Sequence, residues 1–418
     1  MQEALLNPAV RDALSGIRQA DILVGIPSYN NARTIGRVVR AVNAGLAKYF
    51  PEQRCVIVNS DGGSTDGTPE VVLESQIQDY RTILVKHPLY PIHRITTPYH
   101  GIPGKGSAFR TIFRVAEELQ VKACAVLDSD LRSITPEWVE LLVSPVLSGE
   151  FDYVAPYYLR HKFDGTITNS IVHPLTRALY GKRIRQPIGG DFGFSGELAS
   201  LYLQKDVWMS DVARFGIDIW MTTTAICEGF RICQAFLGAK VHDPKDPGSD
   251  LSAMMMQVVG SVFSLMETYH GYWAKIQGSE IVPLFGFEFE VGVDPIPVNV
   301  ERMIAHFRQG LSDLGDIWAQ LIEPENMSAL VHLNTSSAEA FRFPDELWVK
   351  VIYDLAIAYH RRTISGEHIV RSMTPLYLGR VASFVTENMT ASALDVESKI
   401  EGLCLCFEEH KPYLLGRW

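Results

Sequence analysis

The stretch KACAVLDSD, residues 122–130, ends an apolar run with two aspartates one residue apart. The apolar residues before Asp128 predict a short buried strand, and the charged pair marks the point where the chain leaves the core. On a strand, residues two positions apart point to the same side, so Asp128 and Asp130 are placed to converge on one object. Two carboxylates held together favour a hard divalent cation, Mg²⁺ or Mn²⁺, as that object.

The composition is that of an ordinary soluble enzyme, with 418 residues, 47% of them hydrophobic and 21% charged. This length suggests about two domains. The formal net charge is -10 and the chain has no block of five lysines and arginines, so we expect neither nucleic acid nor a membrane surface as a partner. No apolar run reaches the roughly 18 residues that span a bilayer, and the N-terminus lacks a signal-peptide pattern, so we expect a cytoplasmic protein.

The first half of the chain alternates short apolar runs with amphipathic helical patterns. Strands are predicted within 21–30, 54–61, 122–130, 151–160 and 231–242, and helices within 34–50, 68–78, 105–120, 167–181 and 218–230. This alternation predicts a doubly wound α/β sheet of parallel strands joined by crossover helices. Ligands of such sheets bind outside the carboxyl ends of the strands, where we expect the loops at Tyr29, Asp61, Asp128 and His242.

Beyond about residue 255 the pattern becomes helical. Apolar residues recur at helical spacing in 300–322, 345–364 and 374–388. We therefore expect a catalytic α/β domain at 1–262 and a mainly α-helical C-terminal domain at 263–418, with the proline-containing stretch 281–299 as the linker candidate. The apolar faces of the helical part suit either an intrachain lid or a homodimer surface.

The end of the last predicted strand supplies a third candidate metal ligand. His242 ends the strand RICQAFLGAKVH and is placed to complete an O,O,N set with Asp128 and Asp130. A bare D-x-D more often caps a loop, and a lone histidine more often has a structural role. The shared position of these residues at strand ends favours the metal site over both alternatives.

Two glycine-rich loops follow predicted strands. In NSDGGSTDGTPE, residues 59–70, Asp61 is placed to accept hydrogen bonds from the N–H groups of uracil or guanine, although the loop also suits a plain helix entry. In HGIPGKGSAF, residues 100–109, Lys105 stands between two glycines before a helix, where backbone N–H groups, helix dipole and ammonium all favour an anion. The alternative for Lys105 is a solvated side chain on a glycine turn.

Taken in order, IPSYNN, SDGGSTDGT, GKG, LDSDL and a late strand-end histidine resemble the motifs of GT-A glycosyltransferases, which have a Rossmann-like fold. The segments RHKFDGTITNSIVHPLTRALY, QPIGGDFGFS, FGIDIW and GAKVHDPKDPGSDLSAM are similar to the retaining enzymes that make mannosylglycerate, glucosylglycerate and glucosyl-3-phosphoglycerate. This resemblance covers roughly residues 20–265. The late segment LYLGRVASFVTEN resembles the mannosylglycerate synthases more closely.

The resemblance implies a role for each matching residue. Around the donor it implies Pro27, Tyr29 and Asp61 at the base and ribose, with Lys105 and Asp128 also in donor binding. It implies a metal site made by Asp128, Asp130 and His242. At the reacting centre it implies the backbone at Ile188 and Gly189, together with Asp218 against sugar hydroxyls. For the acceptor it implies a pocket made by Arg160, Gly165, Thr166 and Thr168.

Two positions depart from the family pattern. Asn31 stands where the families often have an acidic residue, which leaves the base or ribose contacts open to change. Thr166 stands where the 3-phosphoglycerate enzymes carry an arginine, so the bidentate guanidinium contact to a phosphate is missing there. Unphosphorylated D-glycerate is therefore the expected acceptor, unless a basic residue such as His161, Lys162 or Lys240 replaces that arginine.

The expected reaction is hexose transfer from UDP-glucose, GDP-glucose or GDP-mannose to D-glycerate, giving an α-hexosylglycerate compatible solute. A divalent cation and Lys105 would stabilise the charge on the departing diphosphate. Retention follows either from same-face attack or from a covalent intermediate on Asp191 or Asp218. The alternatives are transfer to 3-phosphoglycerate or another small hydroxy acid, a sugar-1-phosphate nucleotidyltransferase, and a non-catalytic sugar-nucleotide-binding scaffold.

Overall fold

The structure of the 418-residue chain is a computed structural model. It describes residues 5–75, 90–241, 251–288 and 298–418. The chain forms two compact units that interleave along the sequence. Unit 1 comprises Met1–Leu159, Ile188–Lys245 and Val282–Gly292, and unit 2 comprises Arg160–Pro187, Asp246–Ile281 and Val293–Trp418. Each unit is described by itself below, within the described residues.

Unit 1 is built on an eight-stranded sheet with the order β10-β8-β5-β7-β4-β1-β2-β3. All neighbouring pairs are parallel except those of β7, which runs antiparallel to both β4 and β5. The strands are β1 (Ile22–Ser28), β2 (Cys55–Asp61), β3 (His93–Pro98), β4 (Ala123–Val126), β5 (Tyr153–Leu159), β7 (Phe192–Ser195), β8 (Ile232–Ala239) and β10 (Leu284–Phe285).

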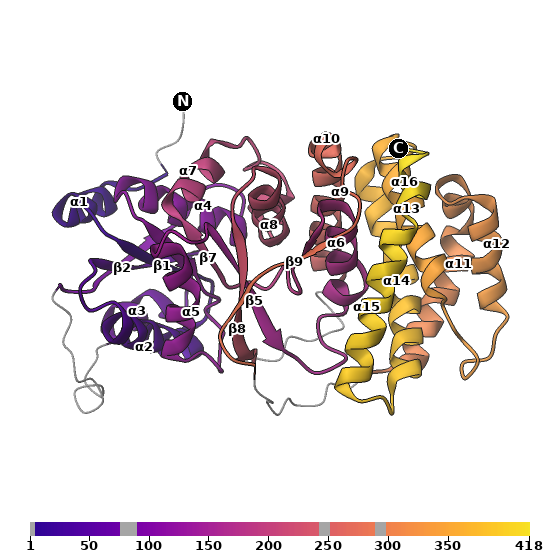
Figure 1. The fold of residues 1–418 in the computed structure, drawn as a ribbon, viewed down its shortest axis with the longest axis horizontal. Coiled ribbons are helices and arrows are strands. Elements are labelled where there is room, and N and C mark those ends of the chain that lie inside the picture. The colour runs from indigo at the N-terminus through magenta and orange to yellow at the C-terminus, as the bar shows by residue number, and fades with distance from the viewer. Residues whose placement is uncertain (1–4, 76–89, 242–250, 289–297) are drawn as a thin grey trace. The chain divides into compact units, whose positions relative to one another are not determined.

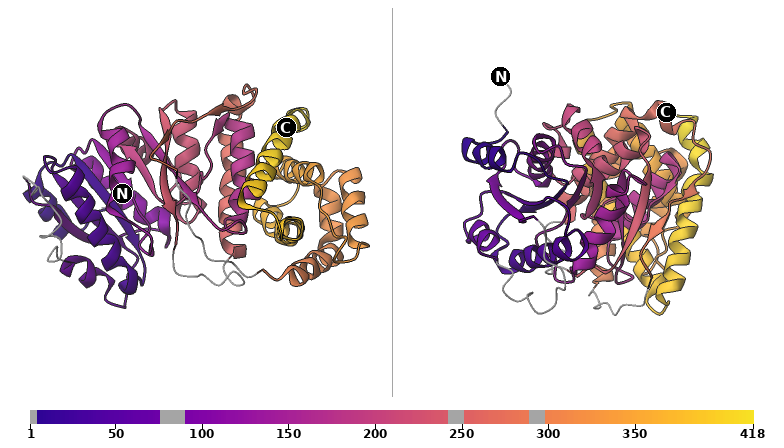
Figure 2. Two further views of the ribbon diagram at one scale, coloured as in Figure 1. Left: turned by 60° about the horizontal axis from the view of Figure 1, so that its bottom comes forward. Right: turned by 60° about the vertical axis from the view of Figure 1, so that its left-hand side comes forward.

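Helices cover both faces of this sheet. Figures 1 and 2 show α2 (Ala32–Tyr49), α3 (Thr68–Glu74) and α5 (Pro136–Leu147) on one face, and α1 (Pro8–Ile17), α4 (Lys105–Glu118) and α7 (Gly196–Gln204) on the other. Because both faces are covered, β1, β2 and β4 are buried along their whole length, as their unbroken apolar runs predict. Helix α8 (Ile217–Cys227) completes the helices of unit 1 and is itself almost entirely buried.

The strand register brings the predicted loops to one edge of the sheet. Ser28 at the end of β1 pairs with Asp61 at the end of β2, and Gly25 of β1 pairs with Val126 at the end of β4. Parallel strands direct their carboxyl ends to the same edge, which is where open α/β sheets bind ligands. The loops that begin at Tyr29, Gly62 and Leu127 therefore start from neighbouring points.

Unit 2 is helical apart from a two-strand pair, β6 (Lys182–Arg183) with β9 (Glu280–Ile281). Two glycines allow its long helices to approach closely: a Cβ on Gly310 would lie 2.2 Å from Pro375, and one on Gly379 would lie 2.7 Å from Phe307. The helices are α6 (His173–Tyr180), α9 (Leu251–Thr268), α10 (His270–Trp273), α11 (Val300–Leu321), α12 (Pro324–Asn334), α13 (Asp345–His360), α14 (Gly366–Asn388), α15 (Ala393–Glu409) and α16 (Lys411–Leu415).

Segment 160–187 belongs to the helical unit because its side chains are anchored there. The buried Arg177 of α6 forms ion pairs with Glu401 and Glu408 of α15, at 2.5 and 2.7 Å. The indole N–H of Trp348 donates to the carbonyl of Ser170 over 2.8 Å. The expected domains 1–262 and 263–418 are contiguous, whereas these compact units are interleaved.

The expected linker needs a correction. Within 281–299, Leu284 and Phe285 form β10, which pairs with β8 and extends the sheet by one strand. Phe285 also packs edge-on against Phe151, with ring centroids 5.5 Å apart. This contact explains why a proline-containing, apolar stretch adds to unit 1 rather than only connecting two domains.

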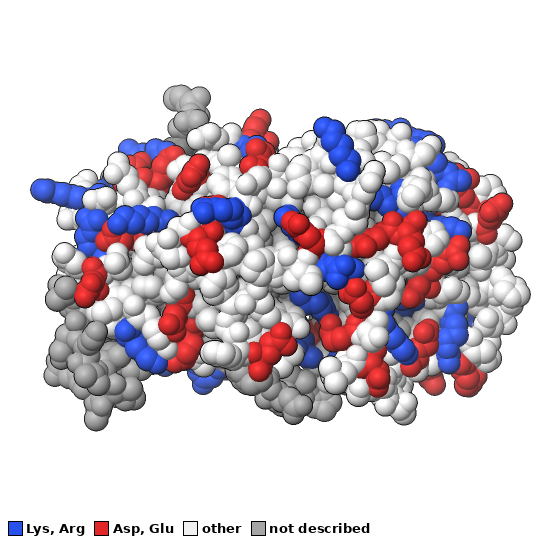
Figure 3. Space-filling model, in the orientation of Figure 1, with Lys and Arg blue, Asp and Glu red and all other residues white. Residues whose placement is uncertain are grey.

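The expected fold class is confirmed: a mostly parallel sheet lies between helices, and a helical region forms the C-terminal part of the chain. In the described ranges, none of the helices combines the length and apolarity needed to cross a bilayer. On the face drawn in Figure 3, acidic and basic side chains are interspersed.

Candidate functional site

Lys105 is held at the start of α4 by its glycine neighbours. A Cβ on Gly104 would lie 2.6 Å from the carbonyl of Ala213, and one on Gly106 would lie 1.8 Å from that of Val212, so only glycine fits on either side. The ammonium of Lys105 lies 2.9 Å from Asp128 and 3.2 Å from Asp218. Asp128 follows β4, and Asp218 stands in the first turn of α8.

A second lysine, Lys240, completes this group just after β8. Its ammonium lies 2.8 Å from Asp128, 2.8 Å from Asp191 and 2.8 Å from the carbonyl oxygen of Gly189. Asp191 also accepts the backbone N–H of Asp128 at 2.8 Å and the hydroxyl of Tyr158. We call the charged side chains of Lys105, Asp128, Asp191, Asp218 and Lys240 the donor-side cluster.

The QPIGG segment passes close to this cluster. Gly190 has a φ of +90°, and a Cβ there would lie 2.3 Å from a carboxylate oxygen of Asp128. Glycine is therefore required both by the backbone conformation and by the space. The structure thus brings Gly189 together with Lys240, while Ile188 lies half-buried one residue earlier.

Burial and charge set the protonation of the cluster. Burial disfavours the ammonium of Lys105, but the carboxylates of Asp128 and Asp218 outweigh it and raise its pKa. Burial also opposes the charge of Asp128, but Lys105 and Lys240 hold its pKa well below the usual range. Burial raises the pKa of both Asp191 and Asp218, with the lysines opposing this shift. The cluster therefore keeps the Lys105 ammonium charged between Asp128 and Asp218.

The metal set expected from the sequence is only partly described. Asp130 lies half-buried after β4, and His242 lies outside the described residues. Among the described residues, no group of three histidine, cysteine or acidic side chains is arranged to hold a metal ion. Val241 is bonded to the loop after Asp130: its carbonyl accepts from Arg132 at 2.8 Å and its N–H donates to Ser133 at 2.9 Å.

The predicted metal ligands can be compared with the ligands that a divalent cation prefers. Carboxylate oxygens suit Mg²⁺ or Mn²⁺, so Asp130 fits a hard cation. Each oxygen of Asp128 contacts one ammonium group, so a cation bound there would share the carboxylate with Lys105 and Lys240. The residues present therefore fit a divalent cation in part, with Asp128 engaged mainly with the lysines.

Asp61 organises the second loop rather than pointing outward. Its carboxylate accepts from the hydroxyls of Ser28 at 2.8 Å and Ser64 at 2.6 Å, and from the N–H groups of Gly63 and Ser64 at 2.9 and 2.7 Å. These four bonds use its acceptor capacity, so a nucleobase N–H would have to replace one of them. The predicted role of Asp61 in base binding stays a prediction.

Tyr29 is the exposed aromatic residue of this edge, with 63% of its surface accessible. A Cβ on Gly62 would lie 3.1 Å from the Tyr29 ring, so the glycine leaves room beside it. Pro27 is buried in β1, two residues before Tyr29. Asn31, the departure from the family pattern, accepts from Tyr29 N–H at 3.0 Å and from the Ser129 hydroxyl at 2.8 Å, so its amide orders the first loop.

The predicted acceptor residues lie together in unit 2. A Cβ on Gly165, whose φ is +64°, would lie 3.7 Å from the Arg160 guanidinium and 3.9 Å from the Thr168 hydroxyl. Arg160 also lies 3.7 Å from Asp164. Thr166 is hydrogen-bonded to the Tyr377 hydroxyl of α14. A π-helical turn, Thr168–Val172, follows, and such turns are often found at functional sites.

The basic residues considered as substitutes for the missing arginine have other partners. The ammonium of Lys162 donates to the carbonyls of Asn388, Met389 and Ala391 at 2.8 to 2.9 Å. His161 packs edge-on against Phe163, with ring centroids 5.4 Å apart, and burial lowers its pKa. Lys240 belongs to the donor-side cluster.

Sequence reasoning missed Lys240 as a member of the charged group. A signal was present, because Lys240 stands two residues before His242 in the strand predicted within 231–242, where alternate residues share a side. Tyr158 was also missed. Its buried hydroxyl bonds to Asp191 and its ring lies under the Lys240 ammonium, 5.1 Å from the centroid, and such a tertiary contact leaves no local pattern.

Comparison with known proteins gives consistent matches. The family model described as "Mannosylglycerate synthase, GT domain" matches residues 67–266. Glucosyl-3-phosphoglycerate synthase of Mycolicibacterium paratuberculosis is 24% identical over 58% of this chain and 71% of that protein. The protein of that name from Mycobacterium tuberculosis strain H37Rv is 24% identical over 58% of this chain and 72% of its own length.

One solved structure is the glucosyl-3-phosphoglycerate synthase from Mycobacterium tuberculosis in complex with Mn²⁺, UDP and glucosyl-3-phosphoglycerate. It matches with 24% identity and a TM-score of 0.45 and covers 61% of this chain and 81% of that chain. The family model and the curated relatives agree with the resemblance drawn from the motifs, and that prediction is confirmed.

Proposed function

We propose that this chain, a glycosyltransferase of the GT-A group that includes the mannosylglycerate and glucosyl-3-phosphoglycerate synthases, transfers a hexose from a nucleoside-diphosphate sugar to a glycerate-type acceptor with retention. The donor-side cluster is the observation that carries the proposal. The largely buried ammonium groups of Lys105, from the start of α4, and Lys240, from the end of β8, meet at Asp128 after β4, on the edge where open α/β sheets bind ligands.

In the proposed reaction, the bond between the anomeric carbon and the diphosphate oxygen breaks, and the negative charge grows on the leaving diphosphate. Lys105 is the group that would meet this charge, because it projects from the N-terminus of α4 and keeps its proton. Asp128 fixes the position of Lys105 at 2.9 Å. Asp218 at 3.2 Å from the same ammonium is placed to hold sugar hydroxyls beside it.

A divalent cation is part of the proposal. Asp130 and His242 are the residues that would hold it, with Asp128 as a further oxygen ligand that it would share with the two ammonium groups. When bound, Mg²⁺ or Mn²⁺ supplies Lewis-acid stabilisation of the diphosphate. If these residues hold the cation, a chelator should abolish turnover while the fold of both units persists.

Retention by same-face attack is favoured over a covalent intermediate. Asp191 is fully buried, and its oxygens already contact Lys240, Tyr158 and the backbone N–H of Asp128. Asp218 is 8% exposed and held by Lys105. Neither carboxylate is presented to an anomeric carbon as a nucleophile, so the departing diphosphate is the base that takes the acceptor proton.

D-glycerate is the proposed acceptor, and 3-phosphoglycerate is the second candidate. Thr166 replaces the family's arginine and bonds to Tyr377, while Lys162 is saturated by three carbonyls, so the described acceptor segment offers a phosphate only Arg160. The names of the curated relatives favour 3-phosphoglycerate instead. The donor is a UDP or GDP sugar carrying glucose or mannose, and the cytoplasmic location and homodimer expected from the sequence stay predictions.

The experiment that tests the proposal is product formation with Mn²⁺ across UDP-glucose, GDP-glucose and GDP-mannose, each offered D-glycerate or 3-phosphoglycerate and resolved by mass spectrometry. We expect a hexosylglycerate with one of these donors, and a lower kcat/KM with 3-phosphoglycerate. A higher kcat/KM with 3-phosphoglycerate overturns the choice of acceptor. Absence of any hexosylated product, with free hexose released at the same rate in the presence and absence of acceptor, overturns the transferase proposal.

A further inference from the structure

A cavity of about 890 Å³ lies in unit 1 between α1 and α4. Its size is within the range of pockets that bind small molecules, about 300 to 1,000 Å³. Four arginines line it, Arg11 and Arg18 from α1 and its end, and Arg110 and Arg114 from α4. Glu118 is the acidic residue among the described lining residues, so the cavity is basic in a chain whose formal net charge is -10.

The arginines differ in what already binds them. Arg114 is neutralised by Glu117 and Glu118, at 2.6 and 2.9 Å. The guanidinium of Arg110 lies 5.3 Å from the centre of the Trp208 ring, and its Nε is buried without a hydrogen-bond partner among the described residues. Arg110 forms no ion pair among the described residues, so its partly exposed guanidinium can pair with a ligand anion.

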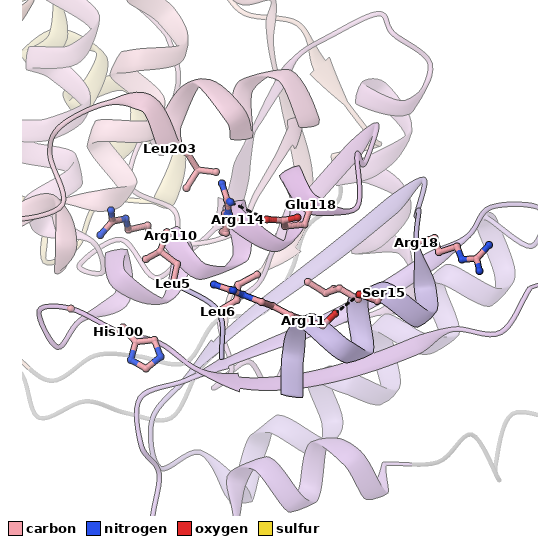
Figure 4. Close-up of a pocket in the computed structure, with 12 residues that line it drawn as sticks. Leu5, Leu6, Arg11, Ser15, Arg18, His100, Arg110, Arg114, Glu118 and Leu203 are labelled. Carbon is pink, nitrogen blue, oxygen red and sulfur yellow. Dashed lines mark hydrogen bonds and ion pairs between the residues drawn. The ribbon is translucent and has the colours of Figure 1, made fainter. Parts of the chain in front are cut away.

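Arg11 supplies a second guanidinium without an ion pair among the described residues. Figure 4 shows Arg11, Arg110 and Arg114 around Leu5 and Leu6, with Arg18 apart at the far end of α1. His100, from the loop before α4, lies on the near side of the same space. The open basic groups therefore come from three separate segments that border one cavity.

The lining chemistry indicates the class of ligand. Planar guanidinium groups pair with both carboxylate and phosphate oxygens, and a neutral sugar offers no such pair. A phosphate group carries up to two negative charges and three acceptor oxygens, so two guanidinium groups from separate segments can share it better than they can share a carboxylate. The buried side chains of Leu6 and Leu14 form an apolar floor, which suits a carbon skeleton or ring next to the phosphate. A concave site of this volume suits a small molecule rather than an extended polyanion.

The cavity is distinct from the donor-side cluster although both use α4. Lys105 points to Asp128 and Asp218. Arg110 and Arg114 follow five and nine positions later, which turns them about 140° and 180° around the helix from Lys105. None of the residues predicted to bind donor, metal or acceptor lines the cavity.

We infer that this cavity is a binding site for a small phosphorylated molecule, held by Arg11 and Arg110 over the leucine floor and separate from the donor site. The inference does not depend on the proposed transferase reaction. It follows from a cavity in which Arg11 and Arg110 have no ion pair among the described residues, and which the residues at the sheet edge do not line.

The test is isothermal titration of inorganic pyrophosphate into the full chain, without divalent metal and at low ionic strength. We expect one site per chain, with Kd raised about tenfold by Arg110→Gln and by Arg11→Gln, because each removes a charge-assisted contact. Arg40→Gln removes the same charge from an exposed site on α2, outside the cavity, and should change Kd by less than about twofold. Arg11 is exposed, so its replacement keeps the test valid if Arg110→Gln fails to fold.

Pyrophosphate also resembles the diphosphate of a sugar nucleotide, so Lys105→Ala serves as the second control. Binding that persists in Lys105→Ala and weakens in the two arginine variants supports the inference. Loss of binding in Lys105→Ala alone places the anion at the donor-side cluster and overturns it. No saturable binding to the wild type, or equal weakening by Arg40→Gln, also overturns it.

Discussion

The donor-side cluster of unit 1 joins five charged side chains by contacts of 3.4 Å or less, whereas in the acceptor segment of unit 2, residues 160–168, Arg160 lies 3.7 Å from Asp164 among hydroxyls and aromatic rings. Every carboxylate in the cluster has an ammonium partner. Thr166 is instead fixed through a neutral hydroxyl pair with Tyr377. Removing one charge from the cluster leaves a close, buried partner unpaired, whereas removing Arg160 from the acceptor segment takes from Asp164 only a longer contact of 3.7 Å.

Replacing a predicted metal ligand beside the donor-side cluster should cause the largest loss of activity. Asp130→Ala should lower metal-dependent turnover by about 10³-fold or more, because the cation carries the charge of the leaving diphosphate. His242→Ala should match it. The measurement is initial rate against Mn²⁺ concentration, with circular dichroism as the fold control and the exposed Asp313→Ala as the matched variant. Full activity in either variant would remove the metal assignment.

Lys105→Ala should have the next largest effect. The substitution removes a transition-state contact and leaves Asp128 and Asp218 with less compensation, so we expect kcat/KM for the donor to fall by about 10²- to 10³-fold. Lys122→Ala, in which the lysine side chain is 64% exposed, is the control and should keep the wild-type value. A similar small loss in both variants would show that the cluster is structural rather than functional.

Arg160→Ala should affect acceptor use without affecting nucleotide binding. We expect the KM for the acceptor to rise by about tenfold or more, from the loss of a charge-assisted contact, while the Kd of the nucleotide stays unchanged. The readouts are acceptor KM by steady-state kinetics and nucleotide Kd by titration. Arg302→Ala on α11 is the exposed control. Equal damage to acceptor use and nucleotide binding would mean that the acceptor pocket is misplaced.

The smallest expected effect concerns the stability of the helical unit. His173 is 5% exposed and bonds through Nδ1 to the carbonyl of Ile184 at 2.7 Å. Burial, with help from the Arg185 charge, lowers its pKa from 6.5 to about 3. The unfolded chain therefore binds the proton first as pH falls, so the stability present above about pH 6.5 is lost progressively between pH 6.5 and pH 3.

Between pH 7 and pH 5 this histidine should account for about 2 kcal/mol of lost stability. The measurement is urea unfolding at the two pH values for wild type and His173→Gln, with the exposed His368→Gln as control. We expect a smaller pH-dependent loss in His173→Gln than in wild type. An identical loss in all three proteins would contradict the buried neutral histidine.

The sequence predicted the parts of the site that follow local rules. Apolar runs that end in Asp61 and Asp128 correctly placed both residues at the carboxyl edge of a parallel sheet, because burial on both faces leaves a continuous apolar signal. The glycine-flanked Lys105 was correctly placed at a helix start. These predictions depend only on neighbours in the chain.

Other features depend on tertiary contacts that leave no local pattern. The antiparallel β7 has four residues and lies between QPIGG and a helix, so neither its existence nor its direction was predicted. Lys240 contacts Asp191 in the cluster, and these two residues lie 49 positions apart in the sequence. The Asp61 carboxylate accepts most of its four hydrogen bonds because of the conformation of the turn that follows it, and residue types alone do not predict that conformation.

Retaining transfer is tested most directly by the configuration of the product, read from the anomeric proton coupling by NMR during turnover of an α-linked sugar nucleotide with D-glycerate and Mn²⁺. We expect an α-hexosylglycerate from the first turnovers, since same-face attack needs no second displacement. A β-linked product would contradict retention, and release of free hexose without any glycerate adduct would contradict the transferase itself.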